Sequence, residues 1–218
     1  MARIQRGNGA PPCYSFPLAP RLTVKHTNLL ILASSSPRRR ELLARAGIQF
    51  SAHAADIPED YRAGEAPQQY AQRLAREKAA AGARDFPGDF ILGADTIVIA
   101  GNEILGKPKD EADAARMLGL LSGTAHQVLT AVCLISPGGV KENVRSEVTR
   151  VHMNKLSDAD IFGYIATGEP MDKAGAYAIQ GIASKWIFKI EGDYSNVVGL
   201  PVALVYQMLR QAGVFEAG

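Results

Sequence analysis

Short apolar runs alternate with segments of helical spacing along most of this 218-residue chain. The longest apolar run, FILGADTIVIA at 90–100, predicts a buried central strand, and Gly101-Asn102 predicts a hairpin turn into a short returning strand at 103–105. Other strands are predicted at 29–33, 49–54, 127–135, 144–153 and 186–190. Strands that alternate with helices around a meander are typical of an α/β fold with a mixed β-sheet.

The helices are predicted from their spacing and their caps. Asp110 is expected to begin a helix that stops at Gly123, and Ser157 with Asp160 resembles a capping box for a helix that ends near 167. A long helix is predicted at 67–84 and a closing helix at 201–212, whereas the glycine-rich segment 172–181 is expected to be irregular.

The stretch LLILASSSPRRRELL at 29–43 predicts a strand, a tight turn and a helix. Ser36 is a natural N-cap, and Pro37 suits the first helical position, where its missing N–H costs nothing. Three consecutive arginines, Arg38 to Arg40, crowd a helix start that is already positive and that favours acids. Two interpretations stay open: serines, backbone N–H groups and guanidinium groups form a phosphate site, or the arginines lie on a solvated helix face.

The composition narrows the class of protein. With 47% hydrophobic and 21% charged residues the chain has the balance of an ordinary globular protein, and its net charge of +2 is too small to indicate nucleic-acid binding. Cys13 and Cys133 are the only cysteines, so a disulfide framework is not indicated and the cytoplasm is the expected location. No apolar run approaches the length of about 18 residues that a membrane span needs.

The first 27 residues differ from the rest of the chain. They contain four prolines, scattered arginines and no periodicity, so we expect a disordered N-terminal extension at 1–27. A transit peptide is disfavoured because serine is scarce and no amphipathic helical pattern is present. A secretory signal is disfavoured because no continuous apolar segment follows the early arginines.

Asp95 is the most informative single residue, because it interrupts the apolar run at 90–100. Burial of an unpaired carboxylate is costly, so a cation or a metal is expected beside it. The alternative is a carboxylate that points outward at a strand end and bonds to a loop. Gly93-Ala94 before it and Thr96 after it leave room for a ligand, which favours the functional interpretation.

Other residues suggest phosphate chemistry more weakly. The acidic turn with Asp56, Glu59 and Asp60 could supply a second carboxylate to Mg²⁺, which prefers oxygen ligands, although such a cluster alone is more typical of a solvated turn. Lys78 is expected on the surface of its helix, while Lys107, between a glycine and a proline, is better placed to meet a ligand. The histidines lack zinc-binding spacing, and no acyl-transfer triad order, Walker A sequence or G-x-G-x-x-G is present.

Five short motifs in this order resemble the Maf family of nucleoside triphosphate pyrophosphatases. They are LASSSPRR at 32–39, GADT at 93–96, GKP at 106–108, SG at 122–123 with His126, and DKAGAY at 172–177 continuing to Gln180-Gly181. Each motif alone is weak, but together they run in sequence from about 29 to 213. The resemblance implies a single domain at 28–218, with a mixed twisted β-sheet flanked by helices as in inosine triphosphatases, and a substrate cleft between two lobes.

The resemblance also implies an activity, the hydrolysis of a nucleoside triphosphate between its α and β phosphates with a divalent cation, Mg²⁺ or alternatively Mn²⁺. Asp95 matches the position of the general base, which acts on the attacking water or through the metal, and Glu59 matches an acidic position near that metal. Positions that hold the phosphates match Ser34, Arg38, Arg39, Lys78 and Lys107, and positions tied to substrate choice match Arg38, Thr96 and Gln180.

The stretch GAYAIQG, with Gln180, resembles the subgroup that acts on dTTP and UTP, as opposed to the subgroup that acts on 7-methyl-GTP. A glutamine amide can accept a hydrogen bond from N3–H of a uracil or thymine ring and donate one to O4. Ala178 and Ile182-Ala183-Ser184 depart from the residues that many relatives have there. The substrate alternatives that stay open are 7-methyl-GTP and a modified nucleotide.

Two other classes of function compete with the enzyme. The family resemblance implies a homodimer and also an association with septum formation, so a non-catalytic regulator of cell division is the main alternative. A nucleic-acid-binding module built on Arg38 to Arg40 is the second, and the near-neutral charge and sparse aromatic residues disfavour it.

Overall fold

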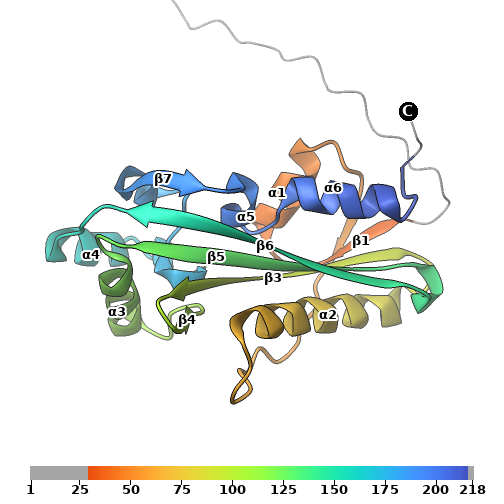
Figure 1. Ribbon diagram of the computed structural model, residues 1–218, viewed down its shortest axis with the longest axis horizontal. Helices are drawn as coiled ribbons and strands as arrows, with labels where there is room; N and C mark the ends of the chain where they lie inside the picture. Colours follow the sequence, from red (N-terminus) through yellow and green to blue (C-terminus); the bar gives the residue numbers. More distant parts are fainter. Residues whose placement is uncertain (1–28, 216–218) are drawn as a thin grey trace, which may run out of the picture.

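The computed structural model describes residues 29–215, so the predicted extension at 1–27 lies outside the described residues. A seven-stranded sheet runs through the molecule in the order β2-β1-β3-β5-β6-β7, with β4 paired to β3 (Figure 1). β1 is parallel to β2 and β3, and the remaining pairs are antiparallel, which confirms the predicted mixed sheet. The strands are β1 (Leu30–Ala33), β2 (Ser51–His53), β3 (Phe90–Ala100), β4 (Glu103–Leu105), β5 (Ala125–Ile135), β6 (Glu142–Met153) and β7 (Ile187–Glu191).

Helices cover both faces of the sheet at the β1 end and gather beside β4 at the other end (Figure 1). One face carries α2 (Pro67–Asp85), and the opposite face carries α1 (Pro37–Arg45) and α6 (Val202–Gln211). At the other end lie α3 (Glu111–Leu121) and α4 (Asp158–Ile165), while the short helix α5 (Tyr194–Val198) connects β7 to α6. The described residues also contain four 3₁₀ turns: Pro137–Gly139, Glu169–Asp172, Ala174–Ala176 and Ile182–Trp186.

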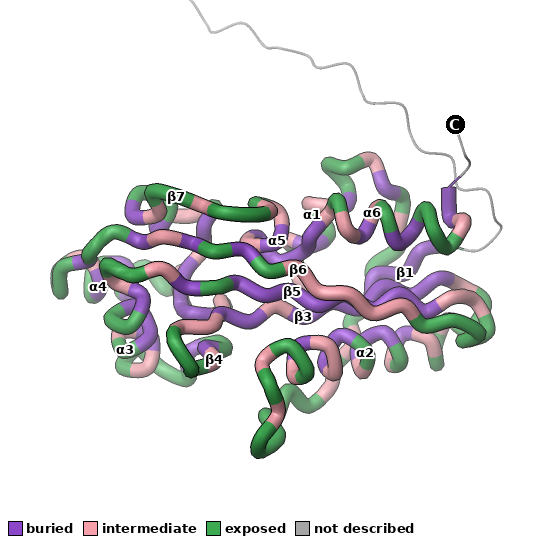
Figure 2. Tube along the Cα trace, in the orientation of Figure 1, coloured by how far each residue is buried: buried purple, intermediate pink, exposed green. Residues whose placement is uncertain are grey.

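The apolar core is divided in the same way as the helices, between the two faces of the sheet and its far end, and Figure 2 shows the buried segments. One apolar cluster packs between the sheet and α1 with α6, around Leu32 and Leu92, and a second packs under α2, around Ile91. A third cluster lies at the far end and includes Leu118 of α3 and Tyr164 of α4. The first two clusters belong to one lobe and the third belongs to the other, so two lobes share one sheet, as the family resemblance implies. Cys133 is fully buried in the α2 cluster.

A gap along the edge of β3 separates the two lobes. β1 pairs with β3 only as far as Leu92, and β4 begins to pair with β3 at Val98, on the edge that β5 leaves free. Residues 93–97 of β3 therefore have a strand neighbour on one edge only. This arrangement opens the sheet to a ligand at the GADT motif.

The predicted caps are confirmed, while several element ends differ from the predicted ones. Ser36, Asp110 and Ser157 each accept the hydrogen bond of an N-cap. β2 is shorter than the predicted 49–54, β5 and β6 each begin two residues earlier than predicted, and α5 was not predicted. Among the described residues, no helix has both the length and the apolar character to cross a membrane.

Candidate active site

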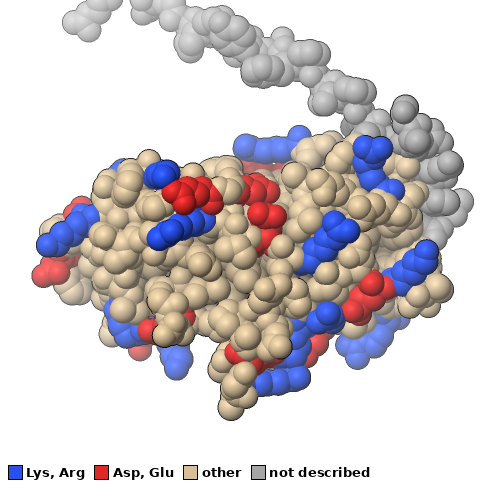
Figure 3. Space-filling model, viewed as in Figure 1, with Lys and Arg blue, Asp and Glu red and all other residues tan. Residues whose placement is uncertain are grey.

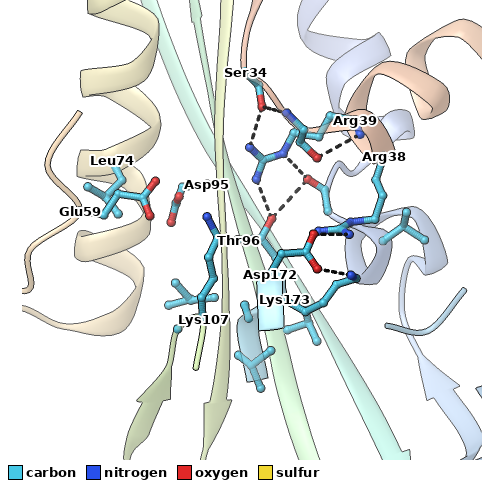
Figure 4. A pocket seen from close by; sticks show the side chains of 18 of the residues that line it. Ser34, Arg38, Arg39, Glu59, Leu74, Asp95, Thr96, Lys107, Asp172 and Lys173 are labelled. Carbon is cyan, nitrogen blue, oxygen red and sulfur yellow. Dashed lines mark hydrogen bonds and ion pairs between the residues drawn. The ribbon is translucent and has the colours of Figure 1, made fainter. Parts of the chain in front are cut away.

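A cleft of about 840 Å³ occupies the gap between the lobes. The turn after β1 and the start of α1 line it on one side, the acidic turn before α2 on another, and the segment 172–180 closes it from the far lobe. Every site residue that the sequence predicts lines this cleft, and Figure 4 shows most of them: Ser34, Arg38, Arg39, Glu59, Lys78, Asp95, Thr96, Lys107 and Gln180. Their placement together agrees with the motifs, and the role of each stays a prediction.

Asp95 and Thr96 point to opposite faces of β3 because successive side chains of a strand alternate. Asp95 shares its face with Ile91, which packs under α2, and it meets Lys78 of that helix. Thr96 shares its face with Leu92 and meets the guanidinium group of Arg39, 3.1 Å away. The open edge of β3 thus exposes both faces of the strand to one cleft.

Lys78 joins the two carboxylates that the sequence predicts at the site. Its Nζ lies 2.6 Å from Asp95 Oδ1 and 2.7 Å from Glu59 Oε1. Lys78 is buried, so the prediction of a surface lysine on the α2 helix is wrong. The cause lies in packing: α2 approaches β3 so closely that a Cβ on Gly93 would lie 2.3 Å from the backbone oxygen of Ala75.

The two carboxylates differ in their surroundings. Burial raises the pKa of Asp95 above its ordinary value, although the charges of Lys78 and Arg39 act in the opposite direction. Partial burial also acts to raise the pKa of Glu59, but the hydrogen bond and charge of Lys78, together with the charges of Lys107 and Arg39, lower that pKa below its ordinary value. The surroundings of the two carboxylates therefore shift their pKa values in opposite directions, upward for Asp95 and downward for Glu59.

The same pair fits a hard divalent cation. Each carboxylate gives one oxygen to the Lys78 ammonium, and the second oxygen of each could bind a divalent cation beside the lysine. Within residues 29–215 no group of three or more His, Cys, Asp and Glu side chains is suited to hold a metal. Mg²⁺ commonly binds through one or two carboxylates and takes its other ligands from water and substrate phosphates, which matches this donor set.

Arg39 is buried in the wall of the cleft, where its side chain connects several segments by hydrogen bonds. Its guanidinium group donates to the backbone oxygens of Gly199 and Ala94, both at 2.9 Å, and to the hydroxyls of Ser34 and Thr96. These four bonds leave one of the five N–H donors of an arginine free. Burial lowers the pKa of Arg39 while the neighbouring carboxylates act to raise it. Arg39 therefore supplies the cleft with positive charge and rigidity more than with free donors.

The side chains of Arg38 and Arg40 point away from the axis of α1 in two directions that differ from that of Arg39. Arg40 is exposed, so it matches the solvated helix face that was the alternative for this run. Arg38 is one-third exposed and forms an ion pair with Asp172 at 3.6 Å, and Asp172 also pairs with Lys173 (Figure 4). The three consecutive arginines thus have three different environments, because each residue of a helix is turned about 100° from the last.

Asp172 and Lys173 were not predicted as site residues, although both line the cleft. Their signal was a charged pair inside a glycine-rich segment of the DKAGAY motif. Tyr177 of the same motif also lines the cleft, and its hydroxyl lies 2.8 Å from Nε2 of His126. Burial lowers the pKa of His126 to about 4, so its ring is neutral at physiological pH and bonds Tyr177 as an uncharged partner. Lys107 points toward Asp95 from the opposite lobe (Figure 4).

Comparisons with known proteins agree with the motifs and the cleft. The family model described as Maf-like protein matches residues 29–212. A protein from Koribacter versatilis named dTTP/UTP pyrophosphatase is 60% identical over 185 residues, which cover 85% of this chain and 95% of the relative. Proteins of the same name from Geotalea uraniireducens and Syntrophomonas wolfei are 52% and 50% identical, covering 86% and 84% of this chain and 96% of each relative. This chain belongs to the Maf-like protein family.

Proposed function

We propose that this protein hydrolyses nucleoside triphosphates, dTTP and UTP above all, to the monophosphate and pyrophosphate. The observation that carries the proposal is the carboxylate pair of the buried Asp95 and the more exposed Glu59 at the open edge of β3, in a cleft that Arg38, Lys78 and Lys107 also line. Basic side chains suit the anionic phosphates of a triphosphate, and a carboxylate with a raised pKa suits a general base.

Asp95 would take a proton from the water that attacks phosphorus, while the bond between the α-phosphorus and the bridging oxygen breaks and pyrophosphate leaves. The raised pKa of Asp95 favours this proton transfer at neutral pH. Lys78 has three N–H donors, of which two face Asp95 and Glu59. The third is free to bond a phosphate oxygen, so Lys78 can connect the base to the substrate.

A divalent cation would bind to Glu59 and Asp95. When bound, it supplies positive charge at the oxygen atoms where negative charge develops during phosphoryl transfer. Arg39 contributes a fixed charge behind the same oxygens, because its own bonds to Ala94 and Gly199 hold it in place. We propose Mg²⁺ as the cation, since the two carboxylates leave room for the waters that this ion retains.

Gln180 would read the base. It lines the cleft, is exposed and lies in a turn. Its amide can pair with N3–H and O4 of thymine or uracil. The names of the relatives from Koribacter, Geotalea and Syntrophomonas support dTTP and UTP as the substrates.

The alternative of a nucleic-acid-binding module receives no support from the surface. Basic and acidic side chains are interspersed on the face that Figure 3 shows. Arg39 is buried, and Arg38 pairs with Asp172, so only Arg40 of the three arginines is fully at the surface. A nucleic-acid site would need a continuous basic patch.

The experiment that tests the proposal is pyrophosphate release from a panel of nucleoside triphosphates, with Mg²⁺ and with EDTA. We expect release only with the metal, and fastest from dTTP and UTP. Fastest release from 7-methyl-GTP would keep the enzyme class and overturn the use of Gln180. No release from any triphosphate would overturn the proposal and favour the regulator.

A further inference from the structure

The turn that carries Gln180 is held by hydrogen bonds to the backbone on both sides of it. Gly181 N donates to the oxygen of Ala178 at 3.1 Å, which closes a tight turn with Ile179 and Gln180 at its two central positions. Ile179 is buried in the apolar cluster of the far lobe, while Gln180 is exposed in the cleft. The backbone N–H groups just before and just after this turn, those of Ala178 and Ile182, point away from the cleft to a common partner.

That partner is a pair of side chains, Tyr164 of α4 and Glu169 of the following 3₁₀ turn. The N–H of Ala178 donates to Tyr164 Oη at 3.1 Å, and Tyr164 Oη donates to Glu169 Oε1 at 2.8 Å. The N–H of Ile182 donates to the same Glu169 oxygen at 3.1 Å. The two side chains therefore form a clamp that closes on both ends of the turn at 178–182.

Gly181 is the residue that lets the clamp close. A Cβ at this position would lie 2.0 Å from Oε1 of Glu169 and 2.5 Å from its carboxyl carbon. Only a residue without a side chain allows the carboxylate so close to the backbone. A side chain at position 181 would therefore push the Glu169 carboxylate aside and open the clamp.

The clamp is built to be rigid. Tyr164 is buried with 2% of its surface exposed, and its ring packs edge-on against Trp186. Burial, together with the Glu169 carboxylate, raises the pKa of Tyr164, so its hydroxyl keeps the proton that it donates. Lys173 fixes the other end of Glu169 by donating from Nζ to its backbone oxygen at 3.0 Å. Lys173 also lines the cleft, so the clamp is continuous with the site.

We propose that Tyr164 and Glu169 are positioning residues that set the selectivity for the base by fixing the turn on which Gln180 sits. The inference rests on the proposed function, since it assigns a base to Gln180. Because the turn is held by hydrogen bonds on both sides, the distance between the Gln180 amide and the base is fixed. This distance sets the size of base that the cleft accepts. If the turn is loosened, the difference in kcat/KM between pyrimidine and purine nucleotides should become smaller. Asp95 and its surroundings, in the other wall of the cleft, should stay unchanged.

The test compares Tyr164→Phe, Glu169→Ala and Glu169→Gln with wild type and with the control Tyr206→Phe, a half-buried tyrosine of α6 outside the cleft. Two quantities are measured for each protein. The first is hydrogen exchange of the backbone amides of Ala178 and Ile182. The second is kcat and KM for dTTP and for dATP, from which the ratio of the two kcat/KM values gives the selectivity.

We expect exchange at these amides to rise about tenfold in Glu169→Ala and less in Glu169→Gln, which keeps one acceptor oxygen. The dTTP-to-dATP selectivity should fall about fivefold to tenfold, through a higher KM for dTTP, with kcat within about twofold of wild type. Unchanged selectivity despite faster exchange would overturn the inference and leave the pyrophosphatase proposal intact. Unchanged exchange would overturn the clamp itself. A wild-type protein that hydrolyses no triphosphate would overturn the proposed function first, and the inference with it.

Discussion

The ammonium nitrogen of Lys78 lies 2.6 Å from Oδ1 of Asp95, and the side chains of both residues are at least nine-tenths buried. The pair exists because Gly93 lets α2 lie directly on β3 and brings the Lys78 turn of the helix to the open edge of the strand. The ion pair therefore depends on a helix-to-strand contact as much as on the two charges. The partner expected beside a buried Asp95 is this lysine, and the cation proposed for catalysis would bind next to it.

Removal of the lysine charge should destabilise the fold. Lys78→Met leaves Asp95 buried without its nearest cation, and we expect a loss of about 3–5 kcal/mol in the free energy of unfolding at neutral pH. Part of the loss should return as the pH falls, because burial already raises the folded-state pKa of Asp95 and protonation removes the unpaired charge. Urea unfolding at two pH values measures both effects.

The control is Lys141→Met, an exposed lysine before β6, which should change stability by less than about 0.5 kcal/mol. The double variant Lys78→Met with Asp95→Asn should recover much of the loss, because the buried carboxylate charge that the lysine compensates is also removed. Equal losses in the single and double variants would mean that the ion pair is not what stabilises this contact.

The contact between α2 and β3 should not tolerate a methyl group at position 93. In Gly93→Ala the new Cβ would lie 2.3 Å from Ala75 O and 2.6 Å from Ala79 N, so α2 must move and Lys78 with it. We expect a loss of about 3 kcal/mol in stability. Gly119→Ala in α3 is the matched control, since its Cβ has no neighbour within 4 Å and alanine favours a helix. Thermal unfolding of the two variants should therefore shift in opposite directions.

The buried arginine of α1 should not be replaceable by lysine. Arg39→Lys loses the planar group that reaches Gly199, Ala94 and Thr96 together, and we expect a loss of about 3 kcal/mol in stability together with weaker nucleotide binding. Arg40→Lys, one residue further along the helix and exposed, should be close to neutral. Equal behaviour of the two variants in urea unfolding would contradict the distinction between the buried and the solvated arginine.

His126 should make the fold less stable in mild acid. Its folded-state pKa is about 4, below the ordinary value of 6.5, so the unfolded chain binds a proton that the folded chain rejects as the pH falls below that ordinary value. We expect this residue to lower the free energy of unfolding by about 1.3 kcal/mol between pH 7.5 and pH 5.5. The comparison is the pH dependence of urea unfolding in wild type, His126→Gln and the more exposed His53→Gln. A slope that survives in His126→Gln would assign it to other groups.

Local pattern was enough to predict the strands, most helices and the burial of Asp95, whereas most residues of the cleft were predicted from the resemblance to the Maf family. The apolar run around Asp95 predicted a buried carboxylate with a cationic partner, and the strand-turn-helix at 29–43 predicted Ser36 as the cap of a positively charged helix start. Both depend on residues that are neighbours in sequence, where spacing and capping preferences act directly.

Contacts between distant segments could not be predicted in the same way. Lys78 has the spacing of an ordinary helical lysine, and nothing near it in sequence reveals that Gly93 brings α2 against Asp95. The division of labour between Arg38 and Arg39 depends on Gly199 and Asp172, which are more than 100 residues away. The helix α5 was missed because five residues give too little periodicity to distinguish a helix from a turn.

The role of Asp95 as the base is tested by the turnover of dTTP with Mg²⁺ by Asp95→Asn, compared with wild type and with Asp85→Asn on the surface of α2. Asparagine keeps the shape of the side chain and cannot act as the base. We expect kcat to fall about 10²–10⁴-fold in Asp95→Asn while dTTP still binds, and Asp85→Asn to resemble wild type. Near-normal turnover by Asp95→Asn would contradict it.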